Sequence, residues 1–415
     1  MTTANLTDKF VKQYAIYIWY LFLAIFSIQI LNFEKLEWFW PFIGLSLLLI
    51  LCKPRITLSL NFVLLILFSL FYIVIMQFNH RLDFENLIKL SVAPILGFVF
   101  GTFYTQGENH KIEASILLIV FSQFIYGFAS VLLNFYLRIN ATYDYKFSMF
   151  YFVDFWYRER TISTYLAMTF MPIMSLLFYA IVVLKQRKFT LSFFLFFAIT
   201  FSLISMNYWS RRTPVYITII VFLINILIAA KFLINKKHEH RKLKKLIIMF
   251  STVIMIVSSC TILMIQNERF SKMISSRVFT MNFINDVRFS TYWSAIQQLN
   301  QFPLGGYKMD LGRLKLVHNM WLDVYNATGI IPFSLLLLIL FSIVYMLFKL
   351  NSQPRMYSLS NLLLTSIMSG LLLNFMVEPI LEEFHHQYIL FCIILGMLDA
   401  HYKKIKKTIS KVSTD

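Results

Sequence analysis

The chain has 415 residues, of which 59% are hydrophobic and only 14% are charged, with a formal net charge of +18 at pH 7. A soluble fold needs about 25% charged residues to cover its surface, so this composition excludes a water-soluble globular protein and indicates a polytopic membrane protein. The basic residues are spread along the chain without forming a basic domain, so nucleic acid is not expected as a partner.

About twelve stretches of the chain are apolar enough to be predicted as membrane-spanning helices, since a helix needs about 20 apolar residues to cross the hydrocarbon core. In chain order they are 14–32, 38–52, 58–77, 87–105, 112–136, 161–184, 190–206, 214–235, 246–266, 330–350, 359–377 and 387–400. We therefore expect an all-α membrane protein with a single integral domain over residues 1–415. Lys9 and Lys12 precede the first stretch and no small-residue cleavage site follows it, which favours a retained helix over a cleaved signal peptide.

The basic residues predict the orientation of these spans. If the spans alternate, the dense basic clusters at 236–245 and 403–407 fall on the same side as the N-terminus. Lys and Arg are enriched in cytoplasmic loops, so both termini are predicted to be cytoplasmic. The cations on the predicted outer side are mostly Arg, whose planar guanidinium suits phosphate better than an ammonium does. Some of these arginines are expected either to bind a phosphorylated ligand or to anchor loops against lipid headgroups.

The predicted spans contain few ionisable residues, with Lys89 and Asp399 lying near helix ends. Transporters place such residues along a path through the bilayer, so a substrate-carrying transporter or flippase is disfavoured. The three cysteines lie in or at the end of apolar runs, which predicts neither a disulfide framework nor a zinc site.

A short outer turn at 207–214 carries two adjacent arginines, Arg211 and Arg212, directly before Pro214, which fits the first turn of the next helix. These arginines either anchor the turn at the membrane surface or pair with a diphosphate at headgroup depth. Tyr208 and Trp209 suit the interfacial aromatic belt.

The large outer loop over residues 267–329 is the longest polar stretch, and a functional site on a rigid bundle is expected here. A short amphipathic helix is predicted in this loop, ending before Pro303, and Arg288 and Tyr292 lie beside its apolar stripe. The stripe has helical spacing and consists of Phe289, Trp293 and Ile296. This pattern is typical of a helix that lies against the membrane surface.

His318 and Asn319 follow in the same loop, and His318 precedes Gly329 by eleven residues. If this stretch is helical, His318 and Gly329 lie on one face, and the missing side chain of Gly329 allows a close approach. His318 is either an ordinary solvated histidine or a candidate base or hydrogen-bond donor.

Together, these three segments resemble the O-antigen ligase and polymerase superfamily of bacterial envelope glycosyltransferases, over residues 207–332 and in the twelve-span layout. The matching elements are Trp209-Ser210-Arg211-Arg212-Thr213-Pro214, Arg288 before Trp293 with the turn Pro303-Leu304-Gly305, and His318-Asn319 followed by Gly329. Pro332 stands where the ligase pattern has Gly, Thr or Tyr, and this departure weakens the ligase assignment.

The resemblance implies transfer of a glycan from undecaprenyl diphosphate at the periplasmic face of the bacterial inner membrane, without a metal or other cofactor. By this resemblance, Arg211 (or Arg212) and Arg288 stabilise the diphosphate, and His318 orients or deprotonates the acceptor hydroxyl. The residues expected to contribute further to substrate binding are Arg212, Asn319, Tyr292 and Gly329. Inversion at the anomeric carbon follows from direct displacement, and the apolar spans form a groove for the polyprenyl tail.

Three functions remain open at this point. The first is an O-antigen ligase that joins O-antigen to lipid A-core in lipopolysaccharide biosynthesis. The second is a repeat-unit polymerase of O-antigen or capsule, which uses the same donor but a second lipid-linked glycan as acceptor. The third and most distant is a polysaccharide flippase, which requires charged residues within the spans.

Overall fold

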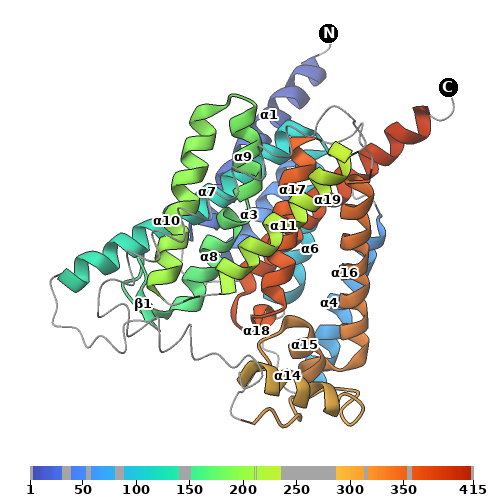
Figure 1. The fold of residues 1–415 in the computed structure, drawn as a ribbon. Helices are drawn as coiled ribbons and strands as arrows, with labels where there is room; N and C mark the ends of the chain where they lie inside the picture. The colour runs from blue at the N-terminus through green and yellow to red at the C-terminus, as the bar shows by residue number, and fades with distance from the viewer. Residues whose placement is uncertain are drawn as a thin grey trace. The chain divides into compact units, whose positions relative to one another are not determined.

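The computed structural model describes residues 3–29, 39–52, 58–79, 88–139, 151–209, 211, 213–234, 287–312, 316–352 and 358–412. Within these residues the chain is mostly helical, as predicted (Figure 1). The helices are α1 Thr3–Ile28, α3 Phe39–Cys52, α4 Leu60–Phe78, the π-helical η1 Ile88–Val92, α6 Ala93–Thr105, α7 Asn109–Ile139, α8 Ser163–Met174, α9 Leu177–Lys185, α10 Phe189–Tyr208, α11 Thr213–Ile234, α14 Val287–Gln298, α15 Met320–Thr328, α16 Ile330–Leu350, α17 Leu359–Phe375, α18 Ile380–Glu383 and α19 His385–Val412.

Among the described residues, seven helical segments are long and apolar enough to cross a membrane, so the protein is a multi-pass membrane protein. They are Leu60–Phe78, Ile88–Thr105, Asn109–Leu137, Ser163–Lys185, Phe189–Tyr208, Thr213–Ala230 and Ile330–Leu350. Three further predicted spans form shorter apolar helices, Tyr14–Ile28, Phe42–Leu51 and Leu359–Phe375. The predicted span at 246–266 lies outside the described residues, so the count of about twelve stays a prediction.

The predicted span at 161–184 is interrupted between α8 and α9. Pro172 lies inside α8 and has no N–H for the helix ladder, and the Ser175 hydroxyl shares the Met171 carbonyl with the Ser175 amide, at 2.9 and 3.0 Å. The next amide, of Leu176, donates to the Ile173 carbonyl only three residues back, at 3.1 Å. The helix therefore ends at Met174 and restarts at Leu177.

A two-stranded antiparallel hairpin, β1 Tyr151–Val153 and β2 Arg160–Ile162, departs from the all-α prediction. Its turn is organised by Asp154, whose Oδ1 accepts from the amides of Trp156 and Tyr157 at 2.8 and 2.9 Å. An Asp side chain that bonds to backbone amides two and three residues later is a common turn device. The Tyr126 hydroxyl donates to the other carboxylate oxygen.

The described residues fall into two compact units. Unit 1 comprises residues 1–125, 291–364 and 375–415, and unit 2 comprises residues 126–290 and 365–374. Within unit 2, helices α8 to α11 pack against one another, and α8 and α9 are almost completely buried.

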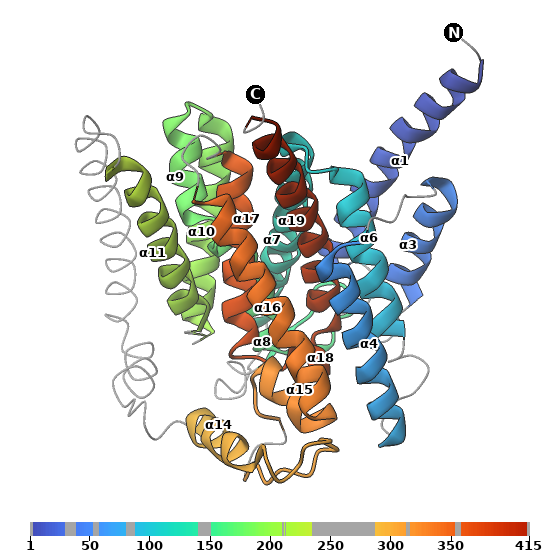
Figure 2. The same cartoon turned by 90° about the vertical axis from the view of Figure 1, so that its right-hand side faces the viewer.

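Unit 1 is built around a close contact between α6 and α19, supported by α4 lying along α16 (Figure 2). A Cβ added at Gly101 would lie 2.1 Å from the Ile393 carbonyl oxygen, and one at Gly396 would lie 2.1 Å from the Phe98 oxygen. Small residues at such positions let two membrane helices bring their backbones into contact.

Two polar clusters mark the opposite ends of unit 1. The His401 end contains His401, whose Nε2 lies 2.5 Å from Asn361 Oδ1 and whose Nδ1 lies 3.3 Å from the Gly107 oxygen. Asp399 lies in the same region and pairs with Lys403 at 3.0 Å. The His318 end gathers α15, α18, the end of α4 and the start of α19, and contains most of the predicted site.

Candidate functional site

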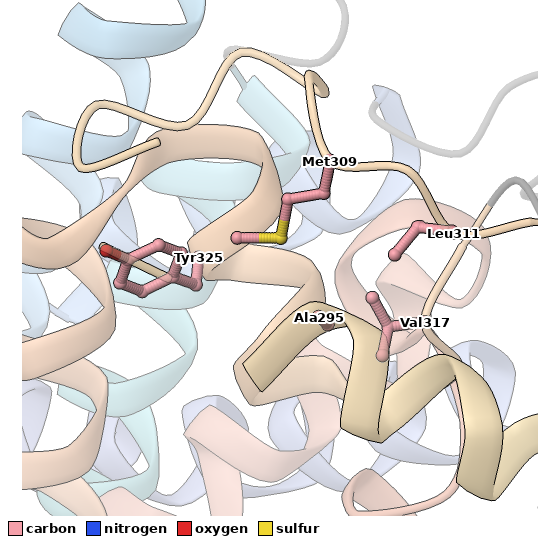
Figure 3. Packing of buried hydrophobic residues seen from close by; sticks show 5 residues of the cluster. All are labelled: Ala295, Met309, Leu311, Val317 and Tyr325. Atoms are coloured by element: carbon pink, nitrogen blue, oxygen red, sulfur yellow. The ribbon is translucent and has the colours of Figure 1, made fainter. Parts of the chain in front are cut away.

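Helix α14 is amphipathic, as the sequence predicts. Its residues Tyr292 and Ala295 pack on a small hydrophobic cluster that we call the loop core, which consists of Ala295, Met309, Leu311, Val317 and Tyr325 (Figure 3). The predicted apolar stripe points away from this core, with Phe289 52%, Trp293 63% and Ile296 46% exposed. The helix therefore has two apolar faces, and the inner one packs on the loop core.

The turn after α14 packs directly on the junction between α15 and α16. The Gly306 and Tyr307 amides donate to the carbonyls of Ala327 and Asn326 at 3.0 and 2.8 Å. The Ile330 amide donates to the Pro303 oxygen at 2.9 Å. The loop is thereby joined to the first turn of a membrane-spanning helix.

Gly329 shows the close approach that the sequence predicts. Its φ is +78°, and an added Cβ would lie 2.1 Å from the Pro303 oxygen. The approaching group is the protein's own backbone, so Gly329 is required by the packing of the turn. Its contribution to substrate binding stays a prediction.

Asn319 determines where α15 begins. Its Oδ1 accepts from the amides of Trp321 and Leu322 at 3.1 and 3.2 Å, which is the bonding of an N-cap residue. Because the helix begins at Met320, His318 precedes it, and the idea that His318 shares a helical face with Gly329 is wrong. The Asn319 Nδ2 donates to the Met376 carbonyl at 2.9 Å, which ties the start of α15 to the segment before α18.

His318 has a left-handed backbone with φ +58°, which is uncommon for a residue with a side chain. Such a conformation costs about 1–2 kcal/mol, so surrounding bonds must hold it. The Tyr292 hydroxyl donates to the His318 carbonyl at 2.8 Å. Arg288 lies one turn before Tyr292 on α14, where residues four apart are neighbours on the helix surface. The structure thus brings Tyr292 together with His318 and Asn319, whereas Arg288, at the start of α14, falls in unit 2.

Asp323, which the sequence analysis did not select, holds the chain on both sides of His318. Its Oδ1 accepts from the Val317 amide at 2.7 Å, and its Oδ2 accepts from the Asn319 amide at 3.0 Å. The residue is 2% exposed. Burial raises the pKa of Asp323 to about 7, although the two amide bonds act in the opposite direction. The sequence signal for Asp323 is its position as an acid in the first turn of a helix that Asn319 caps.

A second carboxylate, Glu382 of α18, lies in the same end of unit 1 and was also missed. Its Oε1 accepts from the hydroxyls of Tyr307 at 2.6 Å and Tyr72 at 3.3 Å. Burial raises the pKa of Glu382, and the Tyr307 hydrogen bond opposes this shift. Burial and the charge of Glu382 raise the pKa of Glu383. These acids can accept hydrogen bonds from sugar hydroxyls but would repel a diphosphate.

The predicted arginine turn lies in unit 2. The Arg211 Nε donates to the Ser163 hydroxyl at 2.8 Å, which places Arg211 beside the first residue of α8. Trp209 is almost fully buried and fixes the end of α10. Arg212 lies outside the described residues. Arg211 and His318 belong to different units, so the structure does not test whether they act in one site.

Within the described part of the chain, no group of three or more His, Cys, Asp or Glu side chains is arranged to hold a metal ion. The chain matches no protein-family model, and none of the curated proteins compared with it matches.

Proposed function

We propose that the protein is a membrane glycosyltransferase that moves a glycan from undecaprenyl diphosphate to an acceptor hydroxyl at the periplasmic face of the bacterial inner membrane. Of the open functions, an O-antigen ligase with lipid A-core as acceptor is our first choice. The observation that carries the proposal is the hydrogen bond from Tyr292 to the His318 carbonyl, because it joins the helix of Arg288 to the histidine segment.

In the proposed reaction, the imidazole of His318 takes the proton of the acceptor hydroxyl. The hydroxyl oxygen attacks the anomeric carbon of the donor sugar, and the bond from that carbon to the diphosphate oxygen breaks. Undecaprenyl diphosphate leaves with the electron pair, and the anomeric configuration inverts. Arg288 and Arg211 are proposed to stabilise the charge that develops on the leaving diphosphate.

The carboxylates near His318 suggest that the proposed site has a cationic side and an acidic side. Arg288 is a cation on α14, whereas Asp323, Glu382 and Glu383 lie on α15 and α18. A diphosphate favours the cationic side, and neutral sugar hydroxyls favour the acidic side. We therefore place the donor near α14 and the acceptor sugar near α18.

The position of Pro332 favours the repeat-unit polymerase as the second candidate, because the ligase pattern has Gly, Thr or Tyr there. Pro332 is buried in the first turn of α16, which is a position that tolerates proline. A polymerase would use the same donor site and differ in the acceptor.

The test uses the purified full-length protein in lipid nanodiscs with an undecaprenyl-diphosphate glycan. Lipid A-core is added in one reaction and omitted in the other. Glycosylated lipid A-core supports the ligase, and a lengthening lipid-linked ladder without it supports the polymerase. Translocation of the donor in proteoliposomes without either product would instead support the flippase and contradict the proposal.

Variants of the two central residues sharpen this test. His318→Ala and Arg288→Ala are expected to lose product formation while still inserting into the membrane. His110→Ala is the matched histidine control, since His110 is 77% exposed and contacts Glu108. Arg187→Ala is the matched arginine control in an exposed turn. Full activity of both site variants would remove the site assignment.

A further inference from the structure

The carboxylate of Asp323 takes no part in the bond changes of the proposed reaction, yet it is bonded to the chain on both sides of His318. Its two oxygens accept from the amides of Val317 and Asn319, the residues on either side of His318. The Asp323 amide donates to the Asn319 carbonyl at 2.8 Å, which closes a reciprocal pair at the start of α15. The backbone of His318 is thus held between two fixed points.

Val317 anchors this arrangement from the other side. Its side chain is fully buried in the loop core, next to Leu311 and Ala295 (Figure 3). The Tyr292 hydroxyl fixes the His318 carbonyl at 2.8 Å. The Asn319 amide and the His318 carbonyl belong to the peptide group after His318, and the Val317 amide fixes the chain one peptide group before it. Between these fixed points, His318 has a left-handed φ of +58°. That angle sets the direction in which the Cα–Cβ bond leaves the backbone.

We propose that Asp323 is a positioning residue for His318, because its carboxylate holds both flanking amides and so sets the direction of the imidazole toward the acceptor hydroxyl. This inference rests on the proposed function, in which His318 is the base. The substitution Asp323→Asn would keep one oxygen acceptor for one of the two amides, of Val317 or Asn319, and would turn an NH₂ group toward the other. The conservative amide variant therefore breaks one of the two bonds without changing the size of the side chain.

The surroundings of Asp323 make the arrangement sensitive to protonation. Glu382 and Glu383 face it from α18, and Tyr72 faces it from α4. A protonated carboxyl group carries an O–H on one oxygen, which accepts more weakly than a carboxylate oxygen, so protonation weakens one of the two amide bonds. Burial, which raises the pKa of Asp323 to about 7, places this loss within an accessible pH range.

The decisive experiment compares Asp323→Asn in two backgrounds. In the protein with His318, the variant is expected to lower kcat about 100-fold, the size of effect that a misplaced catalytic group produces, with little change in the KM for the donor. In His318→Gly, activity is supplied by added imidazole, and a glycine accepts the left-handed conformation at no cost. Asp323→Asn should not lower the imidazole-dependent rate, because no attached ring remains to be positioned. An equal loss in both backgrounds would overturn the proposal.

The pH profile provides a second measurement that does not depend on rescue by imidazole. The logarithm of kcat should fall toward acid with a slope near 2 in the wild type, for protonation of His318 and Asp323, and with a slope near 1 in Asp323→Asn. Thr328→Val is the matched control in α15, since it removes only the bond from the Thr328 hydroxyl to the Val324 carbonyl at 2.8 Å. It should keep kcat and the slope of the wild type.

These outcomes separate the two proposals. No transfer product from the wild type, or full activity in His318→Ala, contradicts the proposed function. An active wild type, an inactive His318→Ala and a fully active Asp323→Asn with an unchanged slope contradict only the role of Asp323.

Discussion

The two ends of unit 1 contain the same three residue types, histidine, asparagine and aspartate, in opposite arrangements. At the His401 end, the bonds run to the imidazole itself, with Asn361 at 2.5 Å and the Gly107 carbonyl at 3.3 Å. At the His318 end, Asn319 caps a helix and Asp323 holds the backbone on both sides of the histidine. These bonds therefore hold the ring of His401 and the backbone around His318.

The largest effect is expected from removing each histidine in turn. His318→Ala should lower turnover more than 1000-fold, on the order of the loss expected for a general base, and leave the apparent melting temperature nearly unchanged. His401→Ala should lower the melting temperature and keep the turnover of the molecules that remain folded. The measurement is kcat per folded protein together with thermal unfolding in detergent. Turnover lost equally in both variants would erase the contrast between the two ends.

The two left-handed glycines beside these clusters extend the comparison. Gly329→Ala and Gly107→Ala would place a Cβ 2.1 Å from the Pro303 oxygen and 2.7 Å from the Ala400 oxygen, respectively. Both variants should unfold at lower temperature. Only Gly329→Ala should also lower kcat, by about 100-fold, because it displaces the turn next to α15. Gly312→Ala is the control for backbone strain alone, since its φ is +66° and no atom of the described residues lies within 4 Å of the added atom.

A smaller effect is expected from Tyr292→Phe, which removes the hydroxyl that donates to the His318 carbonyl. The net value of one such bond is about 1 kcal/mol, so kcat should fall about fivefold while the loop core stays packed. Tyr345→Phe, on the exposed surface of α16, should have no effect on kcat. Steady-state rates at saturating donor distinguish the two variants. An unchanged kcat in Tyr292→Phe would mean that α14 does not help to hold His318.

The smallest effect is a pH dependence of stability at the His318 end. The pKa of Asp323 rises from an ordinary 3.8 to about 7 on folding, so the folded protein binds more protons than the unfolded chain between these values. The contribution of this group to stability is therefore complete below about pH 4 and is lost as the pH rises through about 7. Wild-type protein should melt at a higher temperature at pH 5 than at pH 8, by a few degrees. Asp323→Asn should show a smaller difference, and an equal difference would contradict this assignment.

The apolar patterns of the sequence predict most of the helices in the described residues, because a run of about 20 apolar residues has few alternatives to a membrane helix. The amphipathic helix at α14 also follows from its spacing. The break at Ser175 and the hairpin turn at Asp154 are not predicted, since both depend on single side chains bonding to nearby backbone. In the sequence, Pro172 is the signal for the helix break, and Asp154 is the signal for the hairpin turn.

The candidate site is predictable in part, for a similar reason. His318, Arg288 and Tyr292 are recognisable by type and spacing. Asp323 and Glu382 are harder to recognise, because both are identified by burial and by their hydrogen bonds. Glu382 accepts from Tyr307, which is distant along the chain. Asp323 accepts from the Val317 amide, and this bond depends on the turn of the backbone at His318. A helix that includes His318 is not formed, because Asn319 caps α15 and the helix begins at Met320.

Helix α19 begins with His385 in the region of Glu382 and ends beyond His401, and between these points its backbone touches α6 at Gly101 and Gly396. The two backbones are in contact at these glycines, so a Cβ added at either position would require the helices to move apart. A methyl group at residue 101 would push α6 and α19 apart between His385 and His401. Because α19 begins in the region of Glu382 and continues beyond His401, we expect this single substitution to disturb the His318 end and the His401 end together.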